Sequence, residues 1–173
     1  MKKLIAIVSG EPNSINSEII IKAWKKIKNK KNLFIIGNYF VLKKQISNIG
    51  FNIKVLKIDS IKEFNNKNNL SILNVPLKSK SIFKHNNIDT KNYVLKCLNL
   101  AHYLASKKKI KGFINASIDK KIFDNKYLGV TEYLASKNNV KSKEVMMIYN
   151  KKLSVVPLTT HIEIKDITSK IKI

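Results

Sequence analysis

The sequence predicts an α/β fold with three layers, in which a largely parallel sheet carries helices on both faces. Short apolar runs of strand length recur along the chain, and several are almost continuous, as expected for strands covered on both sides. Segments with helical spacing of apolar residues separate these runs, and such alternation is typical of α/β domains. A length of 173 residues with 44% hydrophobic content is sufficient for a real core.

The expected strands lie at residues 4–8, 33–36, 53–57, 71–75, 110–115, 144–148 and 153–158. A helix is expected over residues 17–30, with lysines opposite an apolar stripe of Ile20, Ala23, Trp24 and Ile27. A second helix is expected from a cap at Asp89 or Thr90 to about residue 108. Its apolar stripe comprises Val94, Cys97, Leu98, Ala101, Leu104 and Ala105.

Residues 9–17, Ser-Gly-Glu-Pro-Asn-Ser-Ile-Asn-Ser, connect the first expected strand to the first expected helix. This is the usual setting for an anion site at a helix amino terminus. The loop lacks the glycine spacing of a dinucleotide fingerprint and the Gly-Lys-Ser/Thr of a P-loop. The sequence therefore leaves two interpretations open, a phosphate contact and a capped turn between strand and helix.

The segment 153–162 carries a candidate metal ligand. Its apolar part, residues 153–158, predicts a buried strand, and Thr159, Thr160 and His161 follow at the carboxyl end. Ligands bind at the carboxyl ends of strands in open α/β sheets, and a neutral imidazole suits a divalent metal. A histidine in this position can equally be an ordinary hydrogen-bonded structural residue.

Further motifs occur along the chain in a fixed order. Gly10, Pro12 and Glu18 are followed by Ser-Ile-Asp-Lys at 117–120, Gly-Val-Thr-Glu at 129–132, Met-Met at 146–147 and Thr-Thr-His at 159–161. Phe-Ile-Ile-Gly at 34–37 and Asn-Val-Pro-Leu at 74–77 belong to the same series. In order and spacing these motifs resemble those of 4-hydroxythreonine-4-phosphate dehydrogenase, and the resemblance covers essentially the whole chain.

The resemblance implies an oxidoreductase of vitamin B6 biosynthesis with an isocitrate/isopropylmalate dehydrogenase-like fold. The implied reaction oxidises 4-(phosphooxy)threonine with NAD or NADP and a divalent metal (Zn, Mg, Mn or Co). Decarboxylation then gives 3-amino-2-oxopropyl phosphate. His161 is the implied metal ligand, and Thr131, at the start of a short helix, is the implied substrate contact. Lys120 can pair with a substrate phosphate or carboxylate, although a surface lysine is the plain alternative. A homodimer is also implied.

The sequence departs from the family pattern in four respects. Ser14, Asn16 and Ser17 replace the family's Gly, Gly and Pro in the first motif, and Ser-Ile-Asp-Lys at 117–120 replaces the family's Pro-Ile-Asn-Lys. Val130 replaces the substrate-contacting histidine of the family's Gly-His-Thr-Glu, and valine neither donates nor accepts a hydrogen bond. The chain is about half as long as the family's chains, whose second half carries two further metal-ligand histidines and most of the nucleotide site. Residues 1–173 are therefore expected to be the amino-terminal portion of a two-domain dehydrogenase, with a possible subdivision near 115–130. The alternative is a non-catalytic half-chain that binds a ligand or a complementing carboxyl-terminal half.

The formal net charge of +23 is compatible with nucleic-acid binding. All of the cationic side chains are lysines, however, whereas readers of nucleic acid use arginine for bidentate contacts. Enrichment in Lys, Asn and Ile also follows from A/T-rich codons, so no specific nucleic-acid partner is expected. A related acyl-transfer enzyme is disfavoured by the Thr-Thr-His segment.

The remaining features predict a cytoplasmic protein. Cys97 is the only cysteine and is expected in the core, so no intrachain disulfide can form. The apolar run at 4–8 is too short for a signal peptide, and no stretch is long enough to cross a membrane. His85 and His102 show no partner pattern and are expected to have structural or solvent-facing roles.

Overall fold

The computed structural model describes residues 4–65, 69–78, 81–140, 143–159 and 162–171. The chain forms two compact units, unit 1 (Met1–Ile122) and unit 2 (Phe123–Ile173). The strands of unit 1 are β1 (Ile5–Val8), β2 (Leu33–Gly37), β3 (Val55–Ile58), β4 (Leu70–Asn74) and β5 (Gly112–Asn115). Its helices are α1 (Asn16–Lys26), α2 (Tyr39–Asn48), the short 3-10 helix η1 (Ile61–Glu63) and α3 (Asn87–Ser106).

The five strands of unit 1 form one sheet in the order β3-β4-β2-β1-β5, and every neighbouring pair is parallel. The first five expected strands are thus confirmed, with ends that differ by at most two residues. β1 lies between β2 and β5, with Ile5 opposite both Leu33 and Gly112. Because all strands are parallel, their carboxyl ends share one edge of the sheet.

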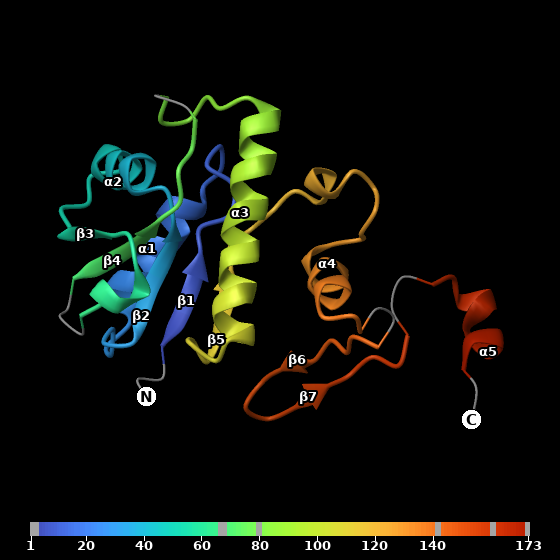
Figure 1. Ribbon diagram of the computed structural model, residues 1–173. Coiled ribbons are helices and arrows are strands. Elements are labelled where there is room, and N and C mark those ends of the chain that lie inside the picture. Colours follow the sequence, from blue (N-terminus) through green and yellow to red (C-terminus); the bar gives the residue numbers. More distant parts are fainter. Residues whose placement is uncertain (1–3, 66–68, 79–80, 141–142, 160–161, 172–173) are drawn as a thin grey trace. The chain divides into compact units, whose positions relative to one another are not determined.

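Helices cover both faces of this sheet, which confirms the expected three-layer α/β fold (Figure 1). On one face, α1 and α2 pack over β2 and β4 around a shared core: Ile20, Ile21, Trp24, Ile35, Leu42, Ile46, Leu70 and Ile72. On the other face, α3 runs along β1 and β5. Its buried residues include Val94, Cys97, Leu98, Ala101 and Leu104, as the apolar stripe predicts.

The helix ends differ from the sequence-based expectation. α1 stops at Lys26 instead of continuing to residue 30, because Ile27 is already extended, with ψ of 121°. Ala23 is exposed, and Ile21 takes a place in the core instead. Asn86, rather than Asp89 or Thr90, caps α3, and its side chain accepts a hydrogen bond from the Asp89 N–H.

α2 is a helix that the sequence analysis did not predict. Asn38 caps it, since the Asn38 side chain accepts a hydrogen bond of 3.0 Å from the Val41 N–H. Val41, Leu42, Gln45 and Ile46 form its buried side. The polar Gln45 in this stripe is the residue that obscured the helical pattern.

The 3-10 helix η2 (Lys120–Phe123) spans the boundary between the two units. Unit 2 contains α4 (Val130–Lys137), β6 (Ile148–Tyr149), β7 (Ser154–Val155), η3 (Ile164–Asp166) and α5 (Ile167–Lys170). Three aromatic rings pack together near its beginning, with centroids 5.1–6.0 Å apart: Phe123, Tyr127 and Tyr133. The Tyr127 hydroxyl also bonds the Ser136 hydroxyl across 3.0 Å.

The strands expected at residues 144–148 and 153–158 are present only in part, as β6 and β7, and the expected burial of 153–158 is wrong. β6 and β7 are two residues long each and form an antiparallel hairpin, with Ile148 opposite Val155. The apolar residues of this stretch are exposed, Leu158 to 78% and Leu153 to 66%. An apolar run of this kind is buried only where another layer of protein packs over it. No described residue packs over this run. Among the described residues, no helix combines the length and apolar character that a membrane span needs.

Candidate active site

The carboxyl edge of the sheet in unit 1 brings together two of the sequence motifs. The chain leaves β1 into the loop 9–15, and it leaves β5 into residues 116–119. β1 and β5 are neighbours in the sheet although β5 is the last strand of the unit. The strands that follow β1 are added on one side of it, and β5 is added on the other side, so the order of strands reverses between β1 and β5. Ligands of open α/β sheets bind outside the carboxyl ends of the strands at such a switch point.

Two hydrogen bonds join these loops. The Asn16 side-chain amide donates to the Ser117 carbonyl oxygen across 2.7 Å. The Asp119 N–H donates to a carboxylate oxygen of Glu11 across 2.6 Å. The motif at 117–120 therefore lies against the loop 9–17, and both loops have a defined conformation.

Gly10 makes this approach possible. Its φ of +69° lies in the left-handed region that side chains rarely adopt. A Cβ on Gly10 would lie 2.5 Å from both the Asn16 Nδ2 and the Ser117 carbonyl oxygen. Glycine is required here both for the backbone conformation and for the space.

Asn13 holds a third segment against the same loop. Its side-chain amide donates to the His85 carbonyl oxygen across 3.0 Å, and its oxygen accepts from the His85 N–H across 3.1 Å. The His85 side chain is buried, and neither of its ring nitrogens has a hydrogen-bond partner among the described residues. From the sequence, His85 was expected either to have a structural role or to face the solvent. The structure shows that its side chain does not face the solvent.

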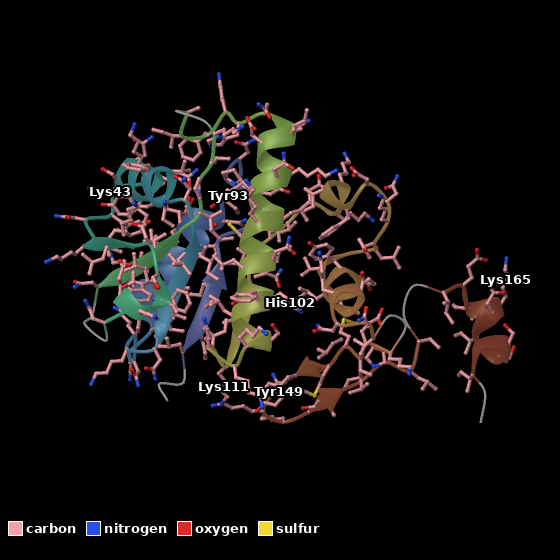
Figure 2. The ribbon with its side chains drawn as sticks, in the orientation of Figure 1. Lys43, Tyr93, His102, Lys111, Tyr149 and Lys165 are labelled. Carbon is pink, nitrogen blue, oxygen red and sulfur yellow. The ribbon has the colours of Figure 1, made fainter. Side chains whose placement is uncertain are left out.

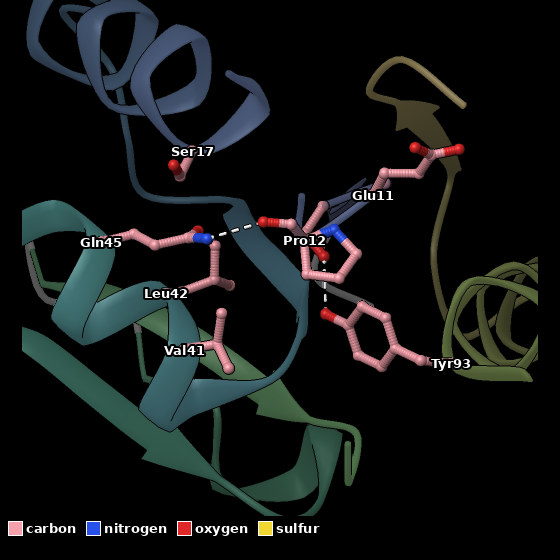
Figure 3. A pocket seen from close by; sticks show the side chains of 9 residues that line it. Glu11, Pro12, Ser17, Val41, Leu42, Gln45 and Tyr93 are labelled. Carbon is pink, nitrogen blue, oxygen red and sulfur yellow. Dashed lines mark hydrogen bonds between the residues drawn. The ribbon is translucent and has the colours of Figure 1, made fainter. Parts of the chain in front are cut away.

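Gln45 of α2 links the loop to the segment before α3. Its side-chain nitrogen donates to the carbonyl oxygens of Pro12 and Ile82, each across 2.8 Å. Figure 3 shows the Gln45 amide directed at Pro12, while the Glu11 carboxylate points away from the cavity between them. The buried amide thus serves as a structural cross-link.

Tyr93 of α3 closes the cavity from the other side. Its hydroxyl bonds the Ser9 hydroxyl across 2.9 Å and accepts from the Asn38 N–H across 2.8 Å. Burial, above all other causes, raises the pKa of Tyr93 well above its ordinary value. Burial likewise raises the pKa of the neighbouring Cys97 to about 12. Both groups are therefore neutral at physiological pH, and Cys97 is the core residue that the sequence predicts.

These contacts bear on the two interpretations of the loop 9–17. Asn13, Ser14 and Asn16 use their side chains in hydrogen bonds within the fold. The cavity beside the loop has a volume of about 10 Å³, close to the space of one water molecule. Small-molecule sites need roughly 300 Å³ or more. In the described part of the chain, the loop thus fits a structural turn between strand and helix, although no side chain caps α1 at Ile15.

A larger hollow of about 380 Å³ lies at the opposite edge of the sheet, where Gly50, Phe51 and Ile53 lead into β3. It is remote from the switch point. We do not assign it to the site, because the motifs that carry the chemistry end at the carboxyl edge.

The predicted site residues fall on both units. In unit 1, Lys120 is exposed and immediately follows Asp119, the donor to Glu11. In unit 2, Val130 and Thr131 are the first two residues of α4, with Val130 half-buried and Thr131 exposed. His161 lies outside the described residues, and Thr159 is half-buried.

A metal site is not formed by the residues that the structure describes. They contain no group of three or more His, Cys, Asp or Glu side chains placed to hold an ion. Catalytic divalent sites generally use about three protein ligands. A single imidazole at position 161 would have to be supplemented by ligands from elsewhere.

Sequence reasoning missed the residues that shape this edge: Asn13, Asn38, Gln45 and Tyr93. Each forms hydrogen bonds to backbone or side-chain atoms at least 37 positions away. The one available signal was a glutamine among apolar residues at helical spacing, because a buried amide requires partners.

A family model and the curated relatives indicate the same family. The family described as pyridoxal phosphate biosynthetic protein PdxA matches residues 29–173. The 4-hydroxythreonine-4-phosphate dehydrogenase of Aquifex aeolicus is 31% identical over 178 residues, and that of Hydrogenobaculum sp. is 30% identical over 173 residues. Both matches cover 99% of this chain and 54% of the relative. The chain therefore spans about half the length of these relatives.

The fold has a counterpart among solved structures. The crystal structure of a 4-hydroxythreonine-4-phosphate dehydrogenase from Burkholderia phymatum superposes with a TM-score of 0.86 at 23% identity. The similarity covers 99% of this chain and 54% of that chain. At this level of identity the likeness supports the fold alone.

Proposed function

Because the chain belongs to the PdxA family of pyridoxal phosphate biosynthetic proteins, we propose that it provides the amino-terminal half of a 4-hydroxythreonine-4-phosphate dehydrogenase. The proposed overall reaction is the oxidation of the secondary alcohol of 4-(phosphooxy)threonine. The hydroxyl proton leaves to a base, a hydride passes to NAD or NADP, and the resulting β-keto acid loses carbon dioxide. The product is 3-amino-2-oxopropyl phosphate.

The observation that carries this proposal is the meeting of two family motifs at the switch point of the sheet. The Asn16–Ser117 and Glu11–Asp119 hydrogen bonds bring the loop 9–17 and the motif 117–120 together. A site in an α/β fold is expected at this edge. The proposed role of the loop 9–17 is to hold the motif 117–120 in position, because the Asn16 and Glu11 side chains form hydrogen bonds to that motif.

We assign proposed roles to three residues. On unit 1, the exposed Lys120 ammonium attracts the phosphate or carboxylate of the substrate as a mobile point charge. On unit 2, the Thr131 hydroxyl, in the first turn of α4, accepts or donates a hydrogen bond to the substrate. Val130 lacks any polar group at the position where the family has histidine, so it weakens this contact.

The described residues do not by themselves fit the metal or the nucleotide. The described residues contain no ion-binding cluster, and the cavity beside the loop 9–15 is too small for a nucleotide. We propose His161 as one ligand of a divalent cation (Zn, Mg, Mn or Co), with the remaining ligands and most of the NAD(P) pocket supplied by the second half. No reaction step is assigned to either group on this chain alone.

The active form is then a complex of this chain with the carboxyl-terminal half of the fold, arranged as a homodimer of the completed protein. The alternative is a non-catalytic half that binds a ligand or partner only. Val130 favours the alternative, because the family's polar substrate contact is absent. The two are separated by an activity measurement on the completed protein.

The test joins the chain to the part of the Aquifex aeolicus relative that it does not span. NADH formation is then measured with 4-(phosphooxy)threonine and an added divalent metal. We expect turnover in the completed protein and none in the 173-residue chain. In the completed protein, His161→Ala is expected to abolish metal-dependent turnover, and Thr131→Val is expected to lower turnover. Thr168→Val is the matched control for Thr131→Val, because Thr168 is an exposed threonine of α5.

Val130→His in the completed protein is expected to increase turnover, because it restores a polar substrate contact. Turnover by the chain alone, or unchanged metal-dependent turnover in His161→Ala, would contradict the proposal. A completed, folded protein without any turnover would favour the non-catalytic alternative.

A further inference from the structure

The β6–β7 hairpin of unit 2 has an unusually exposed apolar surface, formed by Met147, Ile148, Tyr149, Leu153, Val156 and Leu158. We infer that this hairpin surface is the docking site for the carboxyl-terminal half of the fold, the part of the relatives that this chain does not span. The inference rests on the proposed function only for the identity of the partner. It adds where that partner binds.

Both faces of the hairpin are uncovered. Ile148 and Tyr149 are successive residues of β6, so their side chains point to opposite faces. Ile148 is 60% exposed and Tyr149 is 70% exposed; Tyr149 is labelled on the hairpin in Figure 2. Val155 of β7 and Val156, the residue after it, are likewise exposed. A strand with apolar residues on both faces is typical of a sheet that is covered on both sides.

The hairpin also has unpaired edges. Among the described residues, β6 and β7 have only each other as ladder partners. An isolated two-stranded hairpin is marginally stable in water, and a third strand or a packed layer stabilises it. The free N–H and C=O groups along each edge offer main-chain hydrogen bonds to a further strand.

The partner must supply cover for both faces and an added strand. A second copy of the chain that docks by an isologous contact would cover one face and leave the other exposed. The relatives have the same fold over this half and continue for about as many residues again. A polypeptide of that size is large enough to provide both layers.

The positive charge around the hairpin indicates a second property of the partner, an acidic surface. Lys151 and Lys152 form the turn of the hairpin, and Lys143 precedes β6; all three are exposed. Rim charges of this kind favour an acidic partner surface and increase the rate of association at low salt. The docking surface is therefore an apolar centre with a basic rim, which resembles the anatomy of protein interfaces.

The experiment uses the full 173-residue chain and, as the probe, the separately produced carboxyl-terminal part of the Aquifex aeolicus relative. Association is measured by calorimetry or light scattering without substrate, nucleotide or metal. Peroxide oxidation of Met146 and Met147, followed by mass spectrometry, reports on the surface itself, because exposed thioethers oxidise readily. We expect ready oxidation in the chain alone and strong protection in the mixture.

Ile148→Asp and Leu158→Asp are expected to weaken association by about tenfold or more, as buried apolar anchors do. Leu158 lies outside the β6–β7 ladder, so its variant separates lost docking from a lost hairpin. Ile88→Asp is the matched control, because Ile88 is 73% exposed on α3 of unit 1. It is expected to bind as the parent chain does.

Three outcomes would overturn the inference. The first is no association of the two polypeptides, and the second is association that the hairpin variants leave unchanged. The third is a chain that self-associates through the hairpin and protects both methionines without the probe, which would identify a second copy as the occupant. Since no readout uses turnover, docking without any dehydrogenase activity would leave this inference standing while removing the proposed activity.

Discussion

The Asn16 side-chain amide donates a hydrogen bond of 2.7 Å to the Ser117 carbonyl oxygen, joining residues that are 101 positions apart in the sequence. This bond closes the loop after β1 onto the segment after β5. Gly10 lies beside this bond, and a Cβ added to Gly10 would come within 2.5 Å of both bonded atoms. The stability of this edge therefore depends on a residue without a side chain.

Gly10→Ala is expected to lower the free energy of unfolding of unit 1 by about 2–4 kcal/mol. The left-handed backbone contributes about 1–2 kcal/mol and the enforced displacement of the Ser117 backbone contributes the rest. Gly50→Ala isolates the backbone contribution, because Gly50 has φ of +76° with open space around it. Gly112→Ala, with neither restriction, should change stability by less than about 0.5 kcal/mol.

The measurement for these variants is urea unfolding followed by the fluorescence of Trp24. Trp24 is the only tryptophan and is buried in the core of unit 1. Equal losses in Gly10→Ala and Gly50→Ala would show that contact with Asn16 and Ser117 does not restrict position 10.

Tyr93→Phe is expected to destabilise unit 1 by about 1–3 kcal/mol, because it leaves the buried Asn38 N–H without its acceptor. Amide exchange at Asn38 should accelerate in this variant. Tyr103→Phe on the same helix is the control, since the Tyr103 ring is 48% exposed. If Tyr103→Phe lost as much stability as Tyr93→Phe, the role of the Tyr93 hydroxyl as acceptor for the Asn38 N–H would be contradicted.

The Cys97 thiol gives a pH dependence of stability at alkaline pH. Burial raises its pKa from 9.0 to about 12, so the unfolded chain loses this proton first as pH rises. The stabilising contribution is complete below about pH 9 and is lost as pH rises through about 12. Within this window the parent chain should lose up to about 1.4 kcal/mol per pH unit more than Cys97→Ala.

This difference is measured as urea unfolding of the two proteins at intervals above neutral pH. The pKa of Tyr93 is raised too, and Cys97 contributes to that rise, so the comparison reports the effect of Cys97 together with its effect on Tyr93. Identical pH profiles of the parent chain and Cys97→Ala would refute the prediction, as would rapid reaction of the native thiol with an alkylating reagent.

Lys120→Ala in the completed protein is expected to raise KM for 4-(phosphooxy)threonine by about tenfold, with a smaller effect on kcat. The loss of one charge-assisted contact to a phosphate or carboxylate corresponds to about 1.4 kcal/mol or more. Lys121→Ala removes the same charge from the next exposed residue and serves as the control. Steady-state kinetics with varied substrate provide the measurement. Equal changes in both variants would indicate a general effect of charge.

Nucleic-acid binding is expected to be weak, independent of sequence and confined to low salt. The 34 cationic side chains are all lysines, and they are scattered along the chain; Lys43, Lys111 and Lys165 are labelled in Figure 2. Such a surface binds through counterion release, so affinity falls steeply with salt concentration. Titration of two unrelated duplexes at low and physiological salt tests this. Tight binding that distinguishes the duplexes at physiological salt would overturn the codon-composition explanation for the charge.

The sheet of unit 1 was predictable because each strand is a short apolar run with clear breaks. The α3 stripe was predictable for the same reason, since Val94, Cys97 and Leu98 repeat at helical spacing and are all buried. These are local patterns that the sequence contains in full. The cap of α3 was displaced to Asn86 because neighbouring polar residues compete for the same role.

The closure at the carboxyl edge was not predictable in the same way. Asn13, Gln45 and Tyr93 act on segments far away along the chain, and each residue alone resembles an ordinary polar residue. The hairpin error has a different cause. The apolar residues at 153–158 indicate that this segment is suited to burial. They do not indicate which polypeptide covers it.

The position of β1 has a consequence for the order in which the protein folds during synthesis. β1 is made almost first and pairs with both β2 and β5. Its edge toward β5 remains open until Asn115 has left the ribosome, more than a hundred residues later. At about 5–20 residues per second, an apolar strand is left half-paired for roughly 5–20 s. Because an unpaired strand edge favours aggregation, slower translation before Gly112 should increase aggregation of the nascent chain.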